Sequence, residues 1–126
     1  MILENYLKHI QEAGEQSFQM YKRYGTVALL TVSPSTIYNY IFKQIKSSCT
    51  RGCRTFQLDP ACWYSCYIKG VAAVVSAIGR DVGRVNSIPD SNQREKLRAS
   101  LQNELDRWQQ KQEKLKEKLV AARGKK

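Results

Sequence analysis

The four cysteines of this chain fall within eighteen residues, and their spacing constrains the fold more than any other feature. They form two CX3C pairs, Cys49 with Cys53 and Cys62 with Cys66, with eight residues between the pairs. Side chains four residues apart lie on one face of a helix. Each pair therefore places two thiols on one helical face. Two such helices joined by a short connection form an antiparallel hairpin whose cysteines face one another.

A hairpin of this kind predicts a nested pairing of the cysteines, although four cysteines allow three connectivities. One turn back along the first helix matches one turn forward along the second. An inner bridge, Cys53–Cys62, and an outer bridge, Cys49–Cys66, can therefore form together. A bridge within one CX3C pair would strain its helix, and a crossed pairing would twist the hairpin.

Two other states of the cysteines remain open. A tetrahedral zinc site could take all four thiolates, Cys49, Cys53, Cys62 and Cys66, although CX2C is the more usual spacing of zinc ligands. The cysteines could also stay reduced and buried. A catalytic redox role is disfavoured, because its usual motif is CX2C at a helix start. We predict structural disulfides, no cofactor and no metal, with zinc as the alternative.

Helical periodicity runs through the rest of the chain, without a convincing strand pattern. Ser33 before Pro34 gives one cap-plus-proline helix start, and Asp59 before Pro60 gives another. The third helix is expected to run to about Val85. The sequence predicts an all-α fold, in which a disulfide-stapled antiparallel helical hairpin is flanked by an N-terminal amphipathic helix and a long C-terminal coiled-coil-like helix.

Three segments follow from this pattern. Residues 1–32 form an N-terminal helical arm and connector, with a helix over about Leu3–Tyr24 that Gly25 can end. Residues 33–85 form the twin CX3C hairpin. Residues 86–126 form a linker and a basic coiled-coil helix, which opens at Asp90 with Gln93 in a pattern like a capping box.

The C-terminal helix carries an apolar seam at heptad spacing. Such a narrow seam cannot make a core unaided, so we expect another chain or the N-terminal helix to cover it. Its members are Leu101, Leu105, Trp108, Leu115 and Leu119.

Aromatic side chains crowd the cysteine hairpin. They can either pack the short core beside the disulfides or form a partner-binding platform, for which Trp63 and Tyr64 are the leading candidates. A further face of the third helix carries only small residues. These either admit another helix or are tolerated on an exposed side; they are Ala72, Ser76, Gly79 and Gly83.

The net charge is +10, and half of the excess lies in residues 89–126. A basic tail can face nucleic acid, an anionic membrane surface or an acidic partner. Acidic residues interleave with the basic ones, which weakens the nucleic-acid interpretation. That alternative would use Arg94, Lys96, Arg98, Arg107, Lys111 and residues 123–126.

Catalysis and membrane insertion are not indicated. His9 is the only histidine, and it has no convincing set of supporting catalytic groups. The uncharged run Gly25–Phe42 is short and polar for a membrane span, and a buried helix pair broken at Pro34 is the preferred interpretation. Glu4, Glu12 and Glu15 argue against a secretory signal or a mitochondrial presequence at the start of the chain.

The segment Ile45–Tyr67 resembles a known group of proteins. Its twin CX3C pattern is similar to that of the small Tim chaperones of the mitochondrial intermembrane space, and more loosely to twin CX9C (CHCH-like) hairpins and plant α-hairpinins. This resemblance implies a chain trapped by oxidation in the intermembrane space, or associated with the inner membrane.

The expected function is a non-catalytic structural or accessory subunit of a large assembly. A mitochondrial membrane complex, such as a respiratory-chain complex or ATP synthase, is the host that the resemblance favours. The expected partners are protein subunits, with possible contact to a membrane surface and, less favoured, nucleic acid. A virion or capsid structural protein, and a nucleic-acid-binding module, are the alternatives.

Overall fold

The computed structural model describes the backbone of residues 2–124 and the side chains of residues 12–124. The helices are α1 (Ile2–Tyr24), α2 (Pro34–Thr50), α3 (Pro60–Arg84) and α4 (Ser91–Gly124). Two short 3-10 helices, η1 (Gly25–Leu30) and η2 (Val85–Ser87), lie in the connections. The described part of the chain contains no strand, which confirms the all-α prediction.

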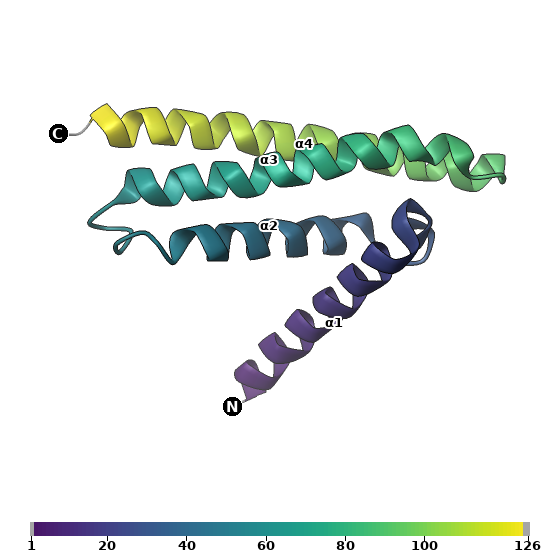
Figure 1. Ribbon diagram of the computed structural model, residues 1–126, viewed down its shortest axis with the longest axis horizontal. Helices are drawn as coiled ribbons and strands as arrows, with labels where there is room; N and C mark the ends of the chain where they lie inside the picture. Colours follow the sequence, from purple (N-terminus) through teal and green to yellow (C-terminus); the bar gives the residue numbers. More distant parts are fainter. Residues whose placement is uncertain (1, 125–126) are drawn as a thin grey trace.

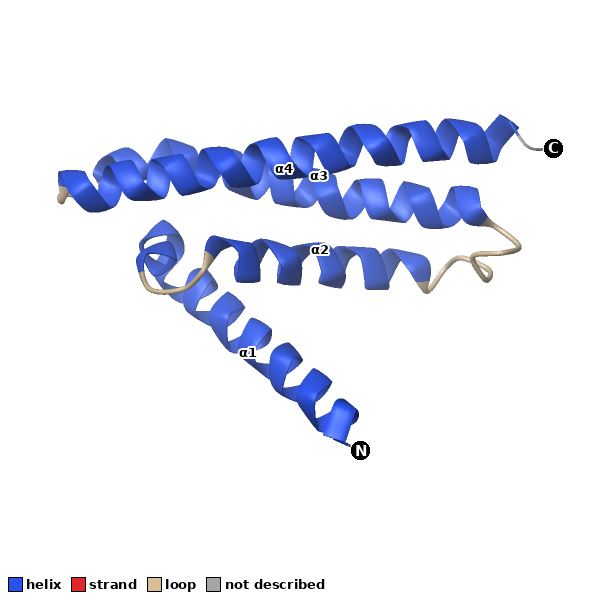
Figure 2. Cartoon of the chain, turned by 180° about the vertical axis from the view of Figure 1, so that it is seen from behind, coloured by secondary structure: helices blue, strands red, loops and turns tan. Residues whose placement is uncertain are grey.

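Helices α2, α3 and α4 lie side by side, and each runs antiparallel to the one before it (Figure 1). Helix α3 packs against both of the others. Helix α1 packs on α2 near the turn that joins them, and its N-terminal half points away from the other helices (Figure 2). The C-terminal end of α4 lies at the same end of the molecule as the loop between α2 and α3. The cysteine hairpin is therefore the central part of a larger helical layer.

Aspartate side chains cap two of the predicted helix starts. The Asp59 carboxylate accepts a hydrogen bond from the Cys62 backbone N–H at 3.3 Å, and Asp90 accepts one from the Gln93 N–H at 2.9 Å. Each bond satisfies a backbone donor that has no partner within its helix. Ser33 occupies the N-cap position of α2, but its hydroxyl makes no capping bond.

The connection between α1 and α2 interrupts the uncharged run Gly25–Phe42. Gly25 ends α1 with φ at +72°, a left-handed conformation that glycine adopts without steric cost. The 3-10 helix η1 follows, and α2 begins only at Pro34. The run Gly25–Phe42 is thus two short elements with a break, as the buried-pair interpretation predicts. Among the described residues, Pro60–Ser87 is the stretch long and apolar enough to span a membrane, judged by length and composition alone.

The seam of α4 is covered within the chain. Leu101 and Trp108 are fully buried, Leu115 is buried, and Leu105 and Leu119 are half-buried. The helix that packs along α4 is α3, which corrects the expectation that another chain or the N-terminal helix covers the seam. The physical reason is that α3 is apolar on more than one side. It can fill the hairpin with α2 and still pack its next face against α4.

One continuous core joins the segments that the sequence separates. It takes Leu29 from η1, Tyr38 from α2, Val71 and Ile78 from α3, and Trp108 from α4. The basic C-terminal helix is therefore part of the folded body.

A glycine that the sequence analysis did not single out permits a close contact between α2 and α3. A Cβ added at Gly70 of α3 would lie 2.7 Å from Phe42 Cδ2 and 3.1 Å from the Phe42 carbonyl oxygen. Gly79 and Gly83, in the predicted small-residue face, have no atom within 4 Å of an added Cβ. That face is exposed in this chain, so the close approach between α2 and α3 occurs at Gly70.

These two environments predict opposite effects of the same substitution. Gly70→Ala should lower the free energy of unfolding by about 1 kcal/mol, because overpacking costs more than the gain in helix propensity. Gly79→Ala should raise it by about 0.5–1 kcal/mol, because only the propensity gain applies. Urea unfolding of both variants and of the unchanged chain measures these changes in the free energy of unfolding. Equal shifts of the same sign would contradict the close contact at Gly70.

Candidate functional site

The two predicted disulfides are both present. Cys49 pairs with Cys66 and Cys53 with Cys62, with Cα–Cα distances of 5.4 and 5.8 Å. One detail differs from the prediction, because α2 ends at Thr50 and Cys53 lies in the turn that follows it. Backbone hydrogen bonds within this turn, such as Cys53 N–H to the Thr50 carbonyl at 3.0 Å, bring Cys53 opposite Cys62.

The two bridges lie close together. The sulfur atoms of Cys53 and Cys66, which belong to different bridges, are 3.8 Å apart. The sulfurs of Cys53, Cys62 and Cys66 all lie within 4.8 Å of one another, a spacing that would also suit a metal ion. All four cysteines are paired, however, and disulfide sulfurs are not the thiolates that zinc requires. The zinc alternative therefore applies only to a reduced chain.

A cluster of aromatic rings surrounds the stapled end. The Phe56 ring lies edge-on to Tyr64, with centroids 5.5 Å apart, and edge-on to Trp63 at 6.3 Å. Trp63 also contacts Tyr67 and donates a hydrogen bond from Nε1 to the Arg54 carbonyl at 2.6 Å. Such edge-to-face pairs add to the stability of the area that they bury. They hold the α2–α3 loop, which the sequence treats only as a connection, against the first turns of α3.

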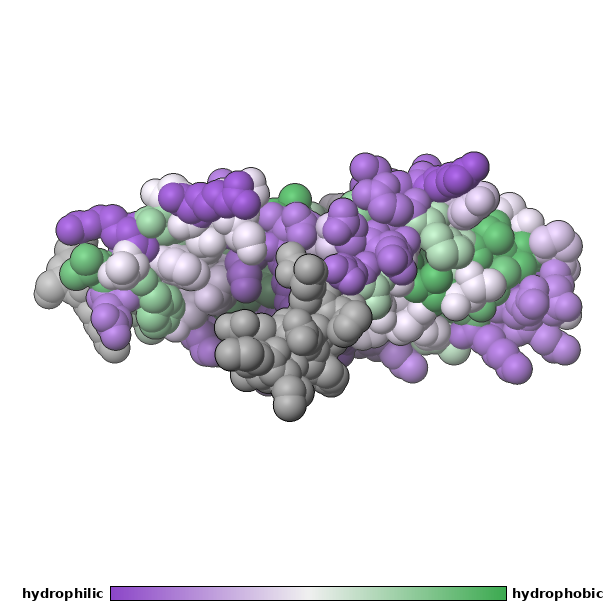
Figure 3. Space-filling model, turned by 90° about the horizontal axis from the view of Figure 1, so that it is seen from below, coloured by the Kyte–Doolittle hydropathy of each residue, from purple (hydrophilic) through white to green (hydrophobic). Residues whose placement is uncertain are grey.

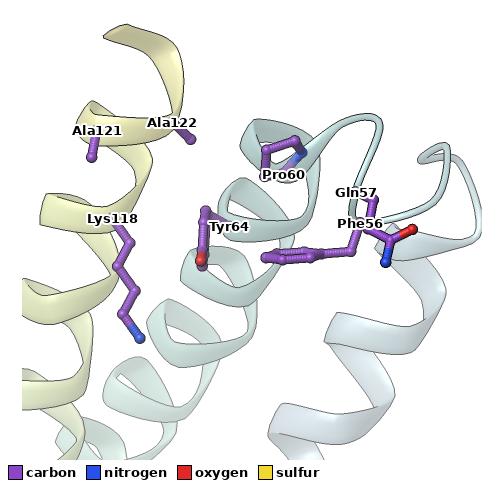
Figure 4. A pocket seen from close by; sticks show the side chains of 7 residues that line it. All are labelled: Phe56, Gln57, Pro60, Tyr64, Lys118, Ala121 and Ala122. Carbon is purple, nitrogen blue, oxygen red and sulfur yellow. The ribbon is translucent and has the colours of Figure 1, made fainter. Parts of the chain in front are cut away.

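A groove of about 320 Å³ lies beside this cluster, between the α2–α3 loop, the start of α3 and the end of α4. Figure 4 shows the Phe56 and Tyr64 side chains on one side of it and the Lys118 side chain, from α4, on the other. Leu58 and Val120, nearby in sequence, are 64% and 70% exposed. Its full lining is Phe56, Gln57, Pro60, Tyr64, Lys118, Ala121 and Ala122.

The predicted partner-binding residues thus separate into two groups. Tyr64 lines the groove, and Trp63 supports it from the half-buried cluster. Of the five seam residues of α4, Leu101, Trp108 and Leu115 belong to the core, Leu105 packs against it, and Leu119 is half-buried. The sequence analysis missed the groove because it is formed by two segments about sixty residues apart.

Apolar side chains are also exposed at the opposite end of the molecule. Met20, Tyr24 and Val27 are 41%, 56% and 56% exposed around the junction of α1 and η1. Figure 3 shows hydrophobic side chains gathered at this end of the visible face. These side chains form an exposed apolar patch at the junction of α1 and η1.

A buried carboxylate joins α1, η1, α2 and α3. Asp81 of α3 is 1% exposed and accepts hydrogen bonds from three hydroxyl groups. Tyr38 donates at 2.6 Å, Thr26 at 2.8 Å, and Tyr21 at 2.8 and 3.0 Å to the two carboxylate oxygens. A buried charge costs free energy unless hydrogen bonds replace its hydration. These bonds satisfy Asp81 and tie the N-terminal helix to the core.

The environment of this network suppresses ionisation of its phenols. Burial, followed by the hydrogen bond to Asp81, raises the pKa of Tyr38 well above its usual range. Burial and the charge of Asp81 raise the pKa of Tyr21 in the same direction. The sequence analysis did not identify Asp81, because its partners lie 43 to 60 residues away and carry no common motif. The available signal was a lone acid within the apolar run of α3.

The fold and this site define a class of protein: an all-α chain built on a helical hairpin with two nested disulfides, consistent with the CHCH-like hairpins that the cysteine pattern resembles. No protein-family model, curated protein or solved structure matches this chain. His9 lies within α1, where the structure describes its backbone but not its side chain.

Proposed function

We propose that this chain is a non-catalytic structural subunit of a larger protein assembly in an oxidising compartment. The observation that carries the proposal is the stapled end, where two disulfides and an aromatic cluster hold one wall of an apolar groove, and α4 forms the other wall. A preformed apolar groove binds a partner without the cost of ordering a loop.

The cysteines support the proposed compartment. Disulfides persist in oxidising compartments and are rare in the cytosol. The twin CX3C pattern adds the resemblance to proteins of the mitochondrial intermembrane space, so a membrane complex of that organelle is the host we propose. A virion protein would satisfy the same chemistry and remains the alternative host.

The charge pattern supports a protein partner over nucleic acid. Several of the basic residues of α4 pair with acids of the same helix: Arg98 with Glu95, Arg107 with Glu104, and Lys116 with Glu113. A nucleic-acid backbone presents a row of phosphates along its length, and the acids of these three pairs would repel it at successive points of α4.

Migration of the native protein in mild detergent tests the proposal. The unchanged chain should migrate with an assembly far larger than its own 14.5 kDa. Leu58→Asp with Val120→Asp should release it as a free chain, because the new charges lie next in sequence to residues that line the groove. Both side chains are already exposed, so the fold should lose little stability. Tyr24→Asp with Val27→Asp, at the opposite end, is the matched control and should stay in the assembly. A free unchanged chain would refute the subunit role, and release by the control pair alone would refute docking through the groove.

A further inference from the structure

Three basic side chains converge on a set of aromatic rings between α2 and α4. Lys111 Nζ lies 4.2 Å from the centroid of the Phe42 ring and 5.0 Å from that of Trp108. Lys46 Nζ lies 5.7 Å from the same Phe42 ring. Arg107 Cζ lies 5.0 Å from the Trp108 ring. Lys46 and Lys111 therefore share one aromatic ring, and Arg107 and Lys111 share another.

The cluster has a shortage of negative charge. Among residues 12–124, Arg107 pairs with Glu104 at 2.8 Å, and no carboxylate lies within ion-pair distance of Lys46 or Lys111. Partial burial, together with the neighbouring charges of Arg107 and Lys46, lowers the pKa of Lys111. The ring faces hold these cations together against their mutual repulsion. An anion bound between them would relieve that repulsion.

The chemistry of the cluster suits one compact anion. The ammonium groups of Lys46 and Lys111 can donate hydrogen bonds to the oxygens of one phosphate group. Arg107 can add one from Nη1, because its Nε and Nη2 contact Glu104. A single-stranded nucleic acid would need open ring faces for base stacking. Here Trp108 is only 1% exposed, Phe42 is half-buried, and lysines already lie over both rings.

We propose that Lys46, Arg107 and Lys111 form a binding site for a single phosphate group, carried either by a soluble phosphate compound or by a lipid headgroup. The site lies on the α2–α4 side of the helical layer, and no residue of it lines the groove at the stapled end. It is therefore independent of the proposed docking of a protein partner.

The test uses the purified, oxidised full chain and two probes. Inorganic phosphate is titrated at constant ionic strength while amide NMR signals of residues 42–46 and 107–111 are followed. Sedimentation then compares phosphatidylcholine vesicles with vesicles that also contain phosphatidic acid. If the site binds a soluble phosphate compound, we expect saturable, localised shifts of these amide signals with inorganic phosphate. If it binds a lipid headgroup, we expect the chain to sediment with the vesicles that contain phosphatidic acid and not with phosphatidylcholine alone.

A matched pair of variants separates the site from net charge. Lys46→Gln with Lys111→Gln should weaken binding of the positive probe at least about tenfold, because two charge-assisted hydrogen bonds are lost. Lys96→Gln with Lys114→Gln removes the same charge from α4 outside the cluster and should weaken binding less than about twofold. Equal loss in both pairs would overturn the proposal, as would absence of binding to both probes. Cluster-dependent binding of single-stranded RNA in place of both probes would overturn it too.

Discussion

Reduction of both disulfides is expected to lower the free energy of unfolding by about 4–5 kcal/mol. The bridges close loops with sequence separations of 17 and 9, for which chain entropy predicts about 3 kcal/mol each. The loops are nested, so closing one already shortens the other and the sum falls below twice the single value. Small domains are stable by only 5–15 kcal/mol, so this loss is a large fraction of the total.

Urea unfolding with and without reductant measures the combined effect. Cys49→Ala with Cys66→Ala, and Cys53→Ala with Cys62→Ala, separate the outer bridge from the inner one. The outer pair should cost more, because its loop is longer and Cys66 is only 2% exposed. Equal midpoints in the oxidised and reduced chain would contradict the prediction. Recovery of the lost stability by stoichiometric zinc would instead assign the reduced cysteines a metal-binding role.

The number of helices and the cysteine pairing were predictable because both depend on short-range patterns. The 3.6-residue periodicity identifies a helix wherever apolar residues recur, and Asp59 and Asp90 mark helix starts through bonds to nearby backbone groups. The nested bridges follow from cysteines four residues apart. Even so, the end of α2 at Thr50 was missed, because a compact turn places Cys53 in nearly the same position as another helical turn would.

The partner of each helical face was not predictable from these patterns. The seam around Leu101 and Trp108 requires a covering helix, but periodicity does not specify which helix covers it. The decisive property was the breadth of the apolar surface of α3, where Val71, Val74 and Ile78 are all fully buried. The groove and the basic aromatic cluster were missed for the same reason. Each combines residues that are distant in sequence and meet only once α4 lies beside α3 and α2.

Replacing Asp81 by alanine is the second change expected to have a large effect, with a loss of about 4 kcal/mol in the free energy of unfolding. Hydrogen bonds to a charged group contribute about 1.5–3 kcal/mol, and a buried donor left unpaired costs about 1–3 kcal/mol. Tyr38 is fully buried and Thr26 is 6% exposed, so neither hydroxyl can turn to water. The individual costs do not add within one network, which keeps the expected total below their sum.

Graded variants locate this effect in the network. Asp81→Asn keeps the shape and one acceptor oxygen, so it should cost about half as much as Asp81→Ala. Tyr21→Phe should cost about 1–2 kcal/mol, because the bond that it removes is only part-buried. Asp106→Ala, at an exposed position of α4, is the control and should change stability by less than about 0.5 kcal/mol. Equal losses in Asp81→Ala and the control would refute the role of the network.

The local consequence of losing Asp81 distinguishes an anchor from a general core contact. Tyr21 and Thr26 hold the end of α1 and the start of η1, whereas the disulfides hold α2 to α3 independently. Amide hydrogen exchange in Asp81→Ala should therefore accelerate most over residues 14–30 and least over 60–70. Alkaline pH should weaken the unchanged chain in the same region. The folded state raises the pKa of Tyr21 and Tyr38, so their contribution is complete below the unfolded phenol pKa near 10 and declines as the pH rises above it. In Asp81→Ala, uniform acceleration of amide hydrogen exchange along all four helices would show that Asp81 supports the whole core rather than the attachment of α1.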